Sequence, residues 1–220
     1  MPGRTSSDLN ASTRLGAVRG VDDVAAGRRV RVTEGGGAAD WTARFPGLFA
    51  RGYVDYANAD VDFFVGEPPD ELIARIHCIA TDSAGRVIVC RSEQEWRFLP
   101  GGTREPDEPI AETVARELLE EAGAKVTGEP VIFAAQVATS RNEGPYRPHM
   151  PHPLSYWAFA LTTADLIHPP TNPADGEHVV EVLALPVDEA VRWLAVHDQT
   201  AADVVRLAAA MGLLTSPNGS

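Results

Sequence analysis

Three glutamates near the middle of the chain have a spacing that suits the binding of a divalent metal ion. Glu117, Glu120 and Glu121 are related by i, i+3 and i+4, so a helix would present them on one face. Hard cations such as Mg²⁺ and Mn²⁺ prefer oxygen ligands, which carboxylates provide. A solvated acidic helix face is the alternative, and it is the more common meaning of a charge run. The spacing alone therefore permits metal binding without establishing it.

The helix expected around these glutamates favours the metal-binding interpretation. We expect it over residues 108–122, with Asp107 as N-cap, Pro109 in the first turn and Gly123 as a left-handed C-cap. Glutamates near the C-terminal end of a helix oppose its dipole, and neighbouring like charges repel by about 0.2–0.5 kcal/mol per pair. A purely solvated surface has no reason to accept that cost. The apolar arc of the same helix is expected to pack on a sheet.

The loop before this helix extends the pattern. The segment from Gly102 to Ala124 resembles the Nudix box: Gly, five residues, Glu, seven residues, Arg-Glu, an aliphatic residue, any residue, Glu-Glu, any residue, Gly and a second aliphatic residue. Every fixed position is matched, by Gly102, Glu108, Arg116, Glu117, Glu120, Glu121 and Gly123, with Leu118 as the first aliphatic residue. Ala124 is smaller than the usual second aliphatic residue, a departure that affects packing rather than ligands. The resemblance covers roughly residues 72–196, most securely 99–124.

The resemblance to the Nudix family implies a fold and a set of roles. The fold is of the α/β class, the Nudix α/β/α sandwich with a mixed β-sheet, here with an N-terminal extension. The divalent metal ions, Mg²⁺ or Mn²⁺, would be held by Glu117, Glu120, Glu121 and the backbone carbonyl of Gly101. Arg116 and Glu108 would orient the catalytic carboxylates through ion pairing. Structural support of the site would come from Gly102, Glu108 and Gly123.

The implied reaction is hydrolysis of a phosphoanhydride in a nucleoside-diphosphate-linked metabolite, ADP-ribose-like, or in a nucleoside triphosphate. Metal ions would neutralise the diphosphate and lower the pKa of a bound water, whose activation a carboxylate completes. The box does not fix this general base, which varies in the family between a box glutamate and an acid from a downstream loop. The candidates are Glu120 and Glu121 within the box and Glu143 and Glu177 outside it. Glu177 lies in the loop where several relatives keep such a glutamate.

A polar, proline-rich loop over residues 140–153 is the candidate for substrate recognition. Arg141, Tyr146 and Arg147 offer cationic and stacking contacts to an anionic nucleotide. Arg104 in the box loop is a further phosphate contact, with a solvated loop arginine as the equal alternative. His149 and His152 have a spacing that suits a metal, although proline-rich loops hold such residues for many reasons. Ser140 stands where relatives specific for ADP-ribose or dinucleoside polyphosphates have proline or tyrosine, so the substrate class stays open.

Composition narrows the partners. The chain has 31 acidic and 19 basic residues, a formal charge of −12, which disfavours duplex nucleic acid. The N-terminus lacks the apolar core of a secretory signal, and no apolar run approaches the length that spans a membrane. We therefore expect a cytoplasmic protein with a small-molecule nucleotide as its partner. Cys78 and Cys90 are expected to be buried apolar side chains, with a disulfide or metal pair as the alternative.

The elements that must position the box can be outlined from the pattern of apolar and turn residues. We divide the chain into an N-terminal extension, residues 1–70 and partly flexible, a Nudix domain, 71–215, and a tail, 216–220. The aromatic-rich part of the extension, residues 41–65, could cover the pocket, form a homodimer contact or simply pack on the sheet. The expected strands are 72–80 and 86–91, which form a hairpin, then 131–138, 155–161 and 179–185. Helices are expected at 188–196 and at 201–211, the latter between a Thr200 cap and Gly212.

Two other functional classes remain open. A non-catalytic Nudix-fold nucleotide-binding or regulatory module would usually have lost box glutamates and would often carry a basic segment, whereas all the box acids are present and this chain is acidic. An isomerase on the same fold would need an additional metal or cysteine site, for which Cys78 and Cys90 are the only thiols. Of the three classes, a pyrophosphohydrolase is the one that gives every residue of the box a role.

Overall fold

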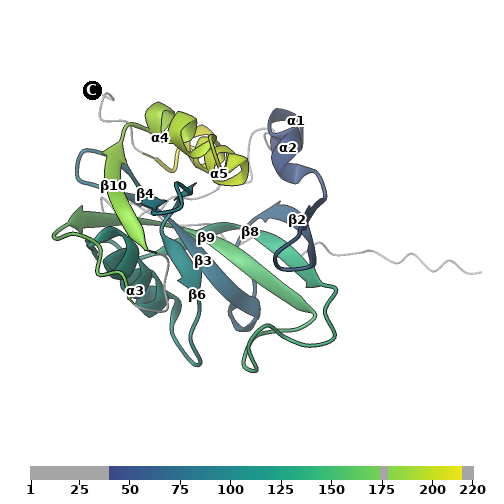
Figure 1. The fold of residues 1–220 in the computed structure, drawn as a ribbon. Helices are drawn as coiled ribbons and strands as arrows, with labels where there is room; N and C mark the ends of the chain where they lie inside the picture. Colours follow the sequence, from purple (N-terminus) through teal and green to yellow (C-terminus); the bar gives the residue numbers. More distant parts are fainter. Residues whose placement is uncertain (1–39, 174–177, 215–220) are drawn as a thin grey trace, which may run out of the picture.

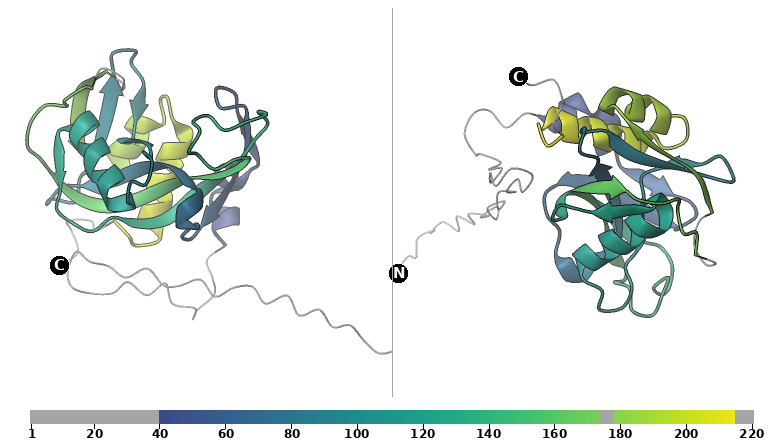
Figure 2. Two further views of the ribbon diagram at one scale, coloured as in Figure 1. Left: turned by 90° about the horizontal axis from the view of Figure 1, so that it is seen from below. Right: turned by 90° about the vertical axis from the view of Figure 1, so that its left-hand side faces the viewer.

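A mixed β-sheet between two layers of helices forms the centre of the protein (Figure 1). The computed structural model describes residues 40–173 and 178–214. Helix α3 (Ile110–Ala122) covers one face of the sheet, and α4 (Val187–Leu194) and α5 (Gln199–Ala210) cover the other (Figure 2). This three-layer arrangement confirms the predicted α/β/α sandwich. Residues 1–39 of the predicted N-terminal extension and the predicted tail 216–220 lie outside the described residues.

The main sheet has the strand order β1-β2-β8-β9-β3-β4-β10. Strands β3 and β9 run parallel and the other neighbours run antiparallel, which makes the sheet mixed. The seven strands span Gly52–Val54 (β1), Ala59–Val65 (β2), Val131–Ser140 (β8), Leu154–Leu166 (β9), Ile73–Thr81 (β3), Val87–Ser92 (β4) and Val179–Leu185 (β10). The short strands β5 (Arg97–Phe98), β6 (Gly101–Thr103) and β7 (Ala124–Val126) pair with β4, β3 and β9.

The predicted hairpin of β3 and β4 forms, but the two strands separate almost at once. They pair only at Thr81 and Val87. Beyond that point β6 takes the free edge of β3, and the Cys78 N–H donates to the Pro100 carbonyl at 2.7 Å. Strand β4 pairs instead with β5 and β10. The sheet is therefore split between β3 and β4, and the loop that precedes α3 fills the split.

Helix α3 ends as predicted and begins differently. Gly123 has φ 60° and ψ 30°, and its N–H donates to the Leu118 and Leu119 carbonyls, so the left-handed C-cap is confirmed. The prediction of Asp107 as N-cap is wrong, because Asp107 itself has a positive φ of 59° and the helix starts at Ile110 after an extended Pro109. The neighbouring Glu108 accepts hydrogen bonds from Arg116 and from the Thr113 hydroxyl in the first turn of α3.

The C-terminal helices lie close to their predicted ranges. The cap of α5 is Asp198, whose carboxylate accepts a hydrogen bond from the Ala201 N–H at 2.8 Å. The predicted Thr200 cap is therefore wrong by two residues, since Asp198 allows the helix to begin two residues earlier, at Gln199. Among the described residues, no helix has the length and apolar character needed to cross a membrane.

The aromatic-rich segment before residue 70 is part of the sheet. Short helices α1 (Trp41–Arg44) and α2 (Pro46–Phe49) precede β1, and a 3-10 turn (Asp70–Leu72) leads into β3. Strand β2 pairs with β8 along its length, from Ala59 opposite Ser140 to Val65 opposite Ala134. The ring of Phe49 contacts that of Phe63 edge to face. Of the three roles considered for this segment, packing on the sheet is therefore confirmed. Cys78 and Cys90 are free and buried, also as predicted.

Replacement of Gly123 by alanine tests the C-cap. The left-handed backbone disfavours any side chain, and a Cβ at this position would overlap the His168 carbonyl. We expect Gly123→Ala to lower the free energy of unfolding by at least about 2 kcal/mol in urea titrations. Gly144→Ala is the matched control, because a Cβ there meets no atom within 4 Å. Equal losses in the two variants would contradict this account of the cap.

Candidate active site

The acidic face of α3 lies against the short strand β6. Glu117 is 6% exposed, and its carboxylate is so close to Gly102 that a Cβ at Gly102 would overlap it. This close approach explains in physical terms why the loop needs glycine at Gly102. The structure thus places the buried glutamate beside the backbone of the box loop.

Arg116 joins the carboxylates of the box. Its Nε donates to Glu108 Oε1 at 2.8 Å, and its Nη1 donates to Glu117 Oε1 at 2.7 Å and to Glu120 Oε2 at 3.3 Å. Its Nη2 completes a two-pronged contact with Glu108 and also reaches the Thr103 carbonyl. The hydrogen bond from Arg116 lowers the pKa of Glu108 to about 2. One guanidinium therefore fixes the positions of three carboxylates.

The two remaining features of the acidic face are the burial of Glu117 and the position of Glu121. Burial raises the pKa of Glu117 even though Arg116 opposes that effect. Glu121 Oε2 accepts a hydrogen bond from the Gly101 N–H at 2.7 Å, which ties the end of α3 to β6. In the described part of the chain, no three His, Cys, Asp or Glu side chains already form a metal cage. The donor set itself suits a hard cation, because carboxylates from one helical turn lie beside the backbone of β6.

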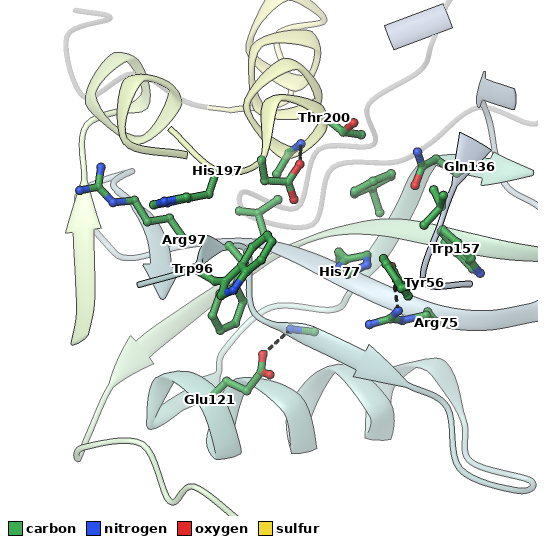
Figure 3. Close-up of a pocket in the computed structure, with 17 residues that line it drawn as sticks. Tyr56, Arg75, His77, Trp96, Arg97, Glu121, Gln136, Trp157, His197 and Thr200 are labelled. Carbon is green, nitrogen blue, oxygen red and sulfur yellow. Dashed lines mark hydrogen bonds between the residues drawn. The ribbon is translucent and has the colours of Figure 1, made fainter. Parts of the chain in front are cut away.

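A cavity of about 350 Å³ opens at the split in the sheet (Figure 3). Glu121 lines it from the side of α3, and the start of α5 lines it from the opposite layer. Gly101 of β6 also lines it. Strands β3, β8 and β9 supply Arg75, His77, Gln136, Trp157 and Phe159, and the β4–β5 region supplies Trp96 and Arg97. The split thus connects the box acids with a space on the other face of the sheet.

Sequence reasoning missed the polar residues of this cavity. Arg75 and His77 alternate with buried residues along β3, so their period-two spacing was the signal that could have found them. Burial and, to a smaller extent, the charge of Arg75 together lower the pKa of His77 to about 3. His77 is therefore a neutral ring at physiological pH, stacked on Phe159 at 5.7 Å between ring centroids.

The arginines that line the cavity differ in what they contact. Arg75 Nη1 donates to the Tyr56 hydroxyl at 3.3 Å, while its Nε is buried without a hydrogen-bond partner. Arg97 lies over the Trp193 ring at 4.9 Å and donates to the Trp193 carbonyl. Neither forms an ion pair with a carboxylate within residues 40–173 and 178–214.

The arginines predicted to bind substrate lie outside this cavity, and each is paired with an acid. Arg104 donates to Asp70 Oδ1 at 2.9 Å and braces the box loop through the Glu108 carbonyl. Arg141 pairs with Asp60, and Arg147 pairs with Glu105 at 2.8 Å. Tyr146, which is 84% exposed, and Arg147 line a second cavity of about 340 Å³.

The other acids and histidines considered in the sequence are not gathered at the box. Glu143 is exposed, and Glu177 falls in the gap 174–177, outside the described residues. His149 and His152 each hydrogen-bond a backbone carbonyl, of Arg104 and Asn142 respectively. The pair of histidines therefore shows no shared metal site in the described part of the chain.

Comparisons with solved structures return the following similar proteins. A mutant form of the pyrophosphohydrolase BsRppH from Bacillus subtilis is 16% identical, with a TM-score of 0.49, over 74% of this chain and 96% of that one. A NUDIX hydrolase from Nitrosomonas europaea is also 16% identical, with a TM-score of 0.45, over 63% of this chain and 86% of that one. MutT protein from Bacillus halodurans is 21% identical, with a TM-score of 0.35, over 60% and 78%.

The match to a family model decides the family. Comparison with curated proteins finds no match. The NUDIX domain model matches residues 72–208, more than half of the 220 residues, and this range contains the whole box. The chain therefore belongs to the Nudix family and is an enzyme of the class that hydrolyses phosphorus-containing acid anhydrides.

Proposed function

We propose that the protein is a divalent-metal-dependent pyrophosphohydrolase that acts on a nucleoside-diphosphate-linked metabolite, ADP-ribose-like, or on a nucleoside triphosphate. The observation that carries the proposal is the contact of Glu121 with the Gly101 N–H at the edge of the 350 Å³ cavity. A space of that size holds a small ligand, and it reaches an acid of the box. The cytoplasmic location and a homodimer stay predictions from the sequence.

The proposed metal site consists of Glu117, Glu120, Glu121 and the Gly101 carbonyl. Mg²⁺ or Mn²⁺ bound there would neutralise charge on the anhydride and lower the pKa of the attacking water. Glu117 and Glu120 share Arg116, so their carboxylates are already held side by side. Glu108 in turn holds Arg116 through two hydrogen bonds. These hydrogen bonds support the carboxylates in their positions.

The proposed general base is one of the box acids or Glu177. Of the box acids, Glu121 is the better candidate because it lines the cavity. The side chain of Glu120 is 27% exposed and contacts Arg116. Arg104, Arg141, Tyr146 and Arg147 stay candidates for substrate contacts. The three arginines would have to exchange their carboxylate partners for phosphate oxygens, which makes them weaker candidates than Arg75.

A substrate screen with a box variant tests this function. We expect Mg²⁺- or Mn²⁺-dependent turnover in a panel of ADP-ribose, sugar nucleotides, dinucleotides, coenzyme A and nucleoside triphosphates, with removal of activity by EDTA. Glu120→Gln should lower kcat by roughly 10²–10⁴-fold, because a ligand or base is lost. Glu112→Gln, an exposed position in the first turn of the same helix, should keep full activity.

Two outcomes of the screen would contradict the proposal. Full metal-dependent activity in both Glu120→Gln and Glu121→Gln would show that the box acids are not the site. Absence of turnover across the panel, combined with tight nucleotide binding, would favour a nucleotide-binding module instead.

A second variant tests the contact between the box loop and Glu117. Gly102→Ala would push a methyl group into the Glu117 carboxylate. We expect its affinity for Mn²⁺, measured by calorimetric titration, to fall by about tenfold or more. Gly47→Ala, where a Cβ meets nothing within 4 Å, controls for the effect of the substitution itself. Unchanged Mn²⁺ affinity in Gly102→Ala would remove Glu117 from the proposed site.

A further inference from the structure

Three residues form a wall that is shared by two neighbouring cavities. Tyr56, Arg75 and Trp157 line the 350 Å³ cavity that contains Gly101 and Glu121 (Figure 3). The same three residues also line the 340 Å³ cavity beside the loop over residues 140–153. A ligand that extends away from the box acids therefore meets this wall.

The wall is assembled from distant parts of the chain. Arg75 on β3 and Trp157 on β9 are direct neighbours in the register of the two parallel strands. Tyr56 comes from the turn between β1 and β2, before the segment that matches the family model. Its hydroxyl accepts a hydrogen bond from Arg75 at 3.3 Å, and its ring lies nearly parallel to that of Trp157, at 14° with centroids 6.5 Å apart.

The positive charge of Arg75 is not paired with a carboxylate of the described residues. Its Nε is buried without a partner, and no carboxylate of the described residues forms an ion pair with it. By contrast, Arg147, which lines the second cavity, is paired with Glu105. In a chain of formal charge −12, an unpaired guanidinium at a cavity wall is suited to an anionic ligand, and its planar fork matches phosphate.

The aromatic rings supply a stacking surface. Tyr56 is 77% exposed, while Trp157 is held firmly at 8% exposure. Stacking of a base on aromatic side chains depends little on base identity, because every base has a π face. A nucleotide carries both groups that this wall can bind, a phosphate and a planar base.

We propose that Tyr56, Arg75 and Trp157 bind the nucleoside monophosphate half of the substrate. Arg75 pairs with its phosphate, and its base stacks on the two aromatic rings. Tyr56, which the segment before the family domain contributes, then gives the site its preference for nucleotides over phosphates that lack a base. The proposed function places the reacting anhydride at the end of the cavity lined by Gly101 and Glu121. This assignment rests on the proposed function for that position alone.

Binding of product fragments to the full chain tests the assignment without turnover. Calorimetric titration would compare the nucleoside 5′-monophosphates with ribose 5-phosphate, which carries the phosphate and lacks the base. We expect the nucleotides to bind at least about fivefold more tightly than ribose 5-phosphate. Tyr56→Ala should remove most of this difference while leaving the affinity for ribose 5-phosphate nearly unchanged, and Tyr56→Phe should restore it. Arg75→Gln should weaken both ligands to a similar extent.

Tyr53→Ala is the matched control. Tyr53 lies on β1 close to Tyr56, but it contacts Asn58 and Arg141 and does not line either cavity. This variant should keep the preference for nucleotides. Nucleotides that bind no better than ribose 5-phosphate, or a preference that survives in Tyr56→Ala, would overturn the proposal. Failure of the box in the substrate screen would contradict the proposed function and would leave this binding result intact, so the two failures can be told apart.

Discussion

The ion-pair network of Arg116 is the interaction on which the site depends. Glu108, Glu117 and Glu120 all contact this one guanidinium, and Glu117 is almost fully buried. A buried carboxylate without a partner is strongly destabilising, and like charges within one helical turn repel one another. Arg116 offsets both effects because its planar fork donates to several oxygens at fixed angles. Gly102 is a consequence of the same packing, since only a residue without a side chain leaves room for Glu117.

The split in the sheet turns this network into an accessible site. Helix α3 lies on one face of the sheet, while the cavity lies on the side of α5, so an unbroken sheet would separate them. Because β3 and β4 pair only at Thr81 and Val87, strand β6 passes between them and carries Gly101 to the cavity edge. Glu121 follows through its hydrogen bond to the Gly101 N–H. The interruption of the β-ladder is therefore what brings one box acid, Glu121, from the layer of α3 to a ligand space on the other face of the sheet.

The sequence predicts local features of this arrangement better than long-range ones. The box glutamates and the Gly123 cap depend on spacing within one helix and its loop, so their positions follow from helical periodicity. Asp107 failed as a cap because its own backbone is left-handed, which composition does not reveal. The divergence of β3 from β4 depends on competition for strand edges by β5, β6 and β10. The neighbouring positions of Arg75 and Trp157 depend on the register between β3 and β9, which no single segment encodes.

The residues proposed for the reaction and those proposed for substrate binding come from different parts of the chain. The box supplies its acids from one continuous stretch, and their geometry is maintained by hydrogen bonds of Arg116 and by Gly102, not by residues of the β1–β2 turn. The opposite end of the cavity depends on Tyr56, which enters from a strand pair added at the edge of the sheet next to β8. Changes at Tyr56 therefore alter the cavity wall without disturbing the ion pairs of the box. The edge of the sheet can thus supply a stacking surface for a nucleotide base without any change in the hydrolytic acids.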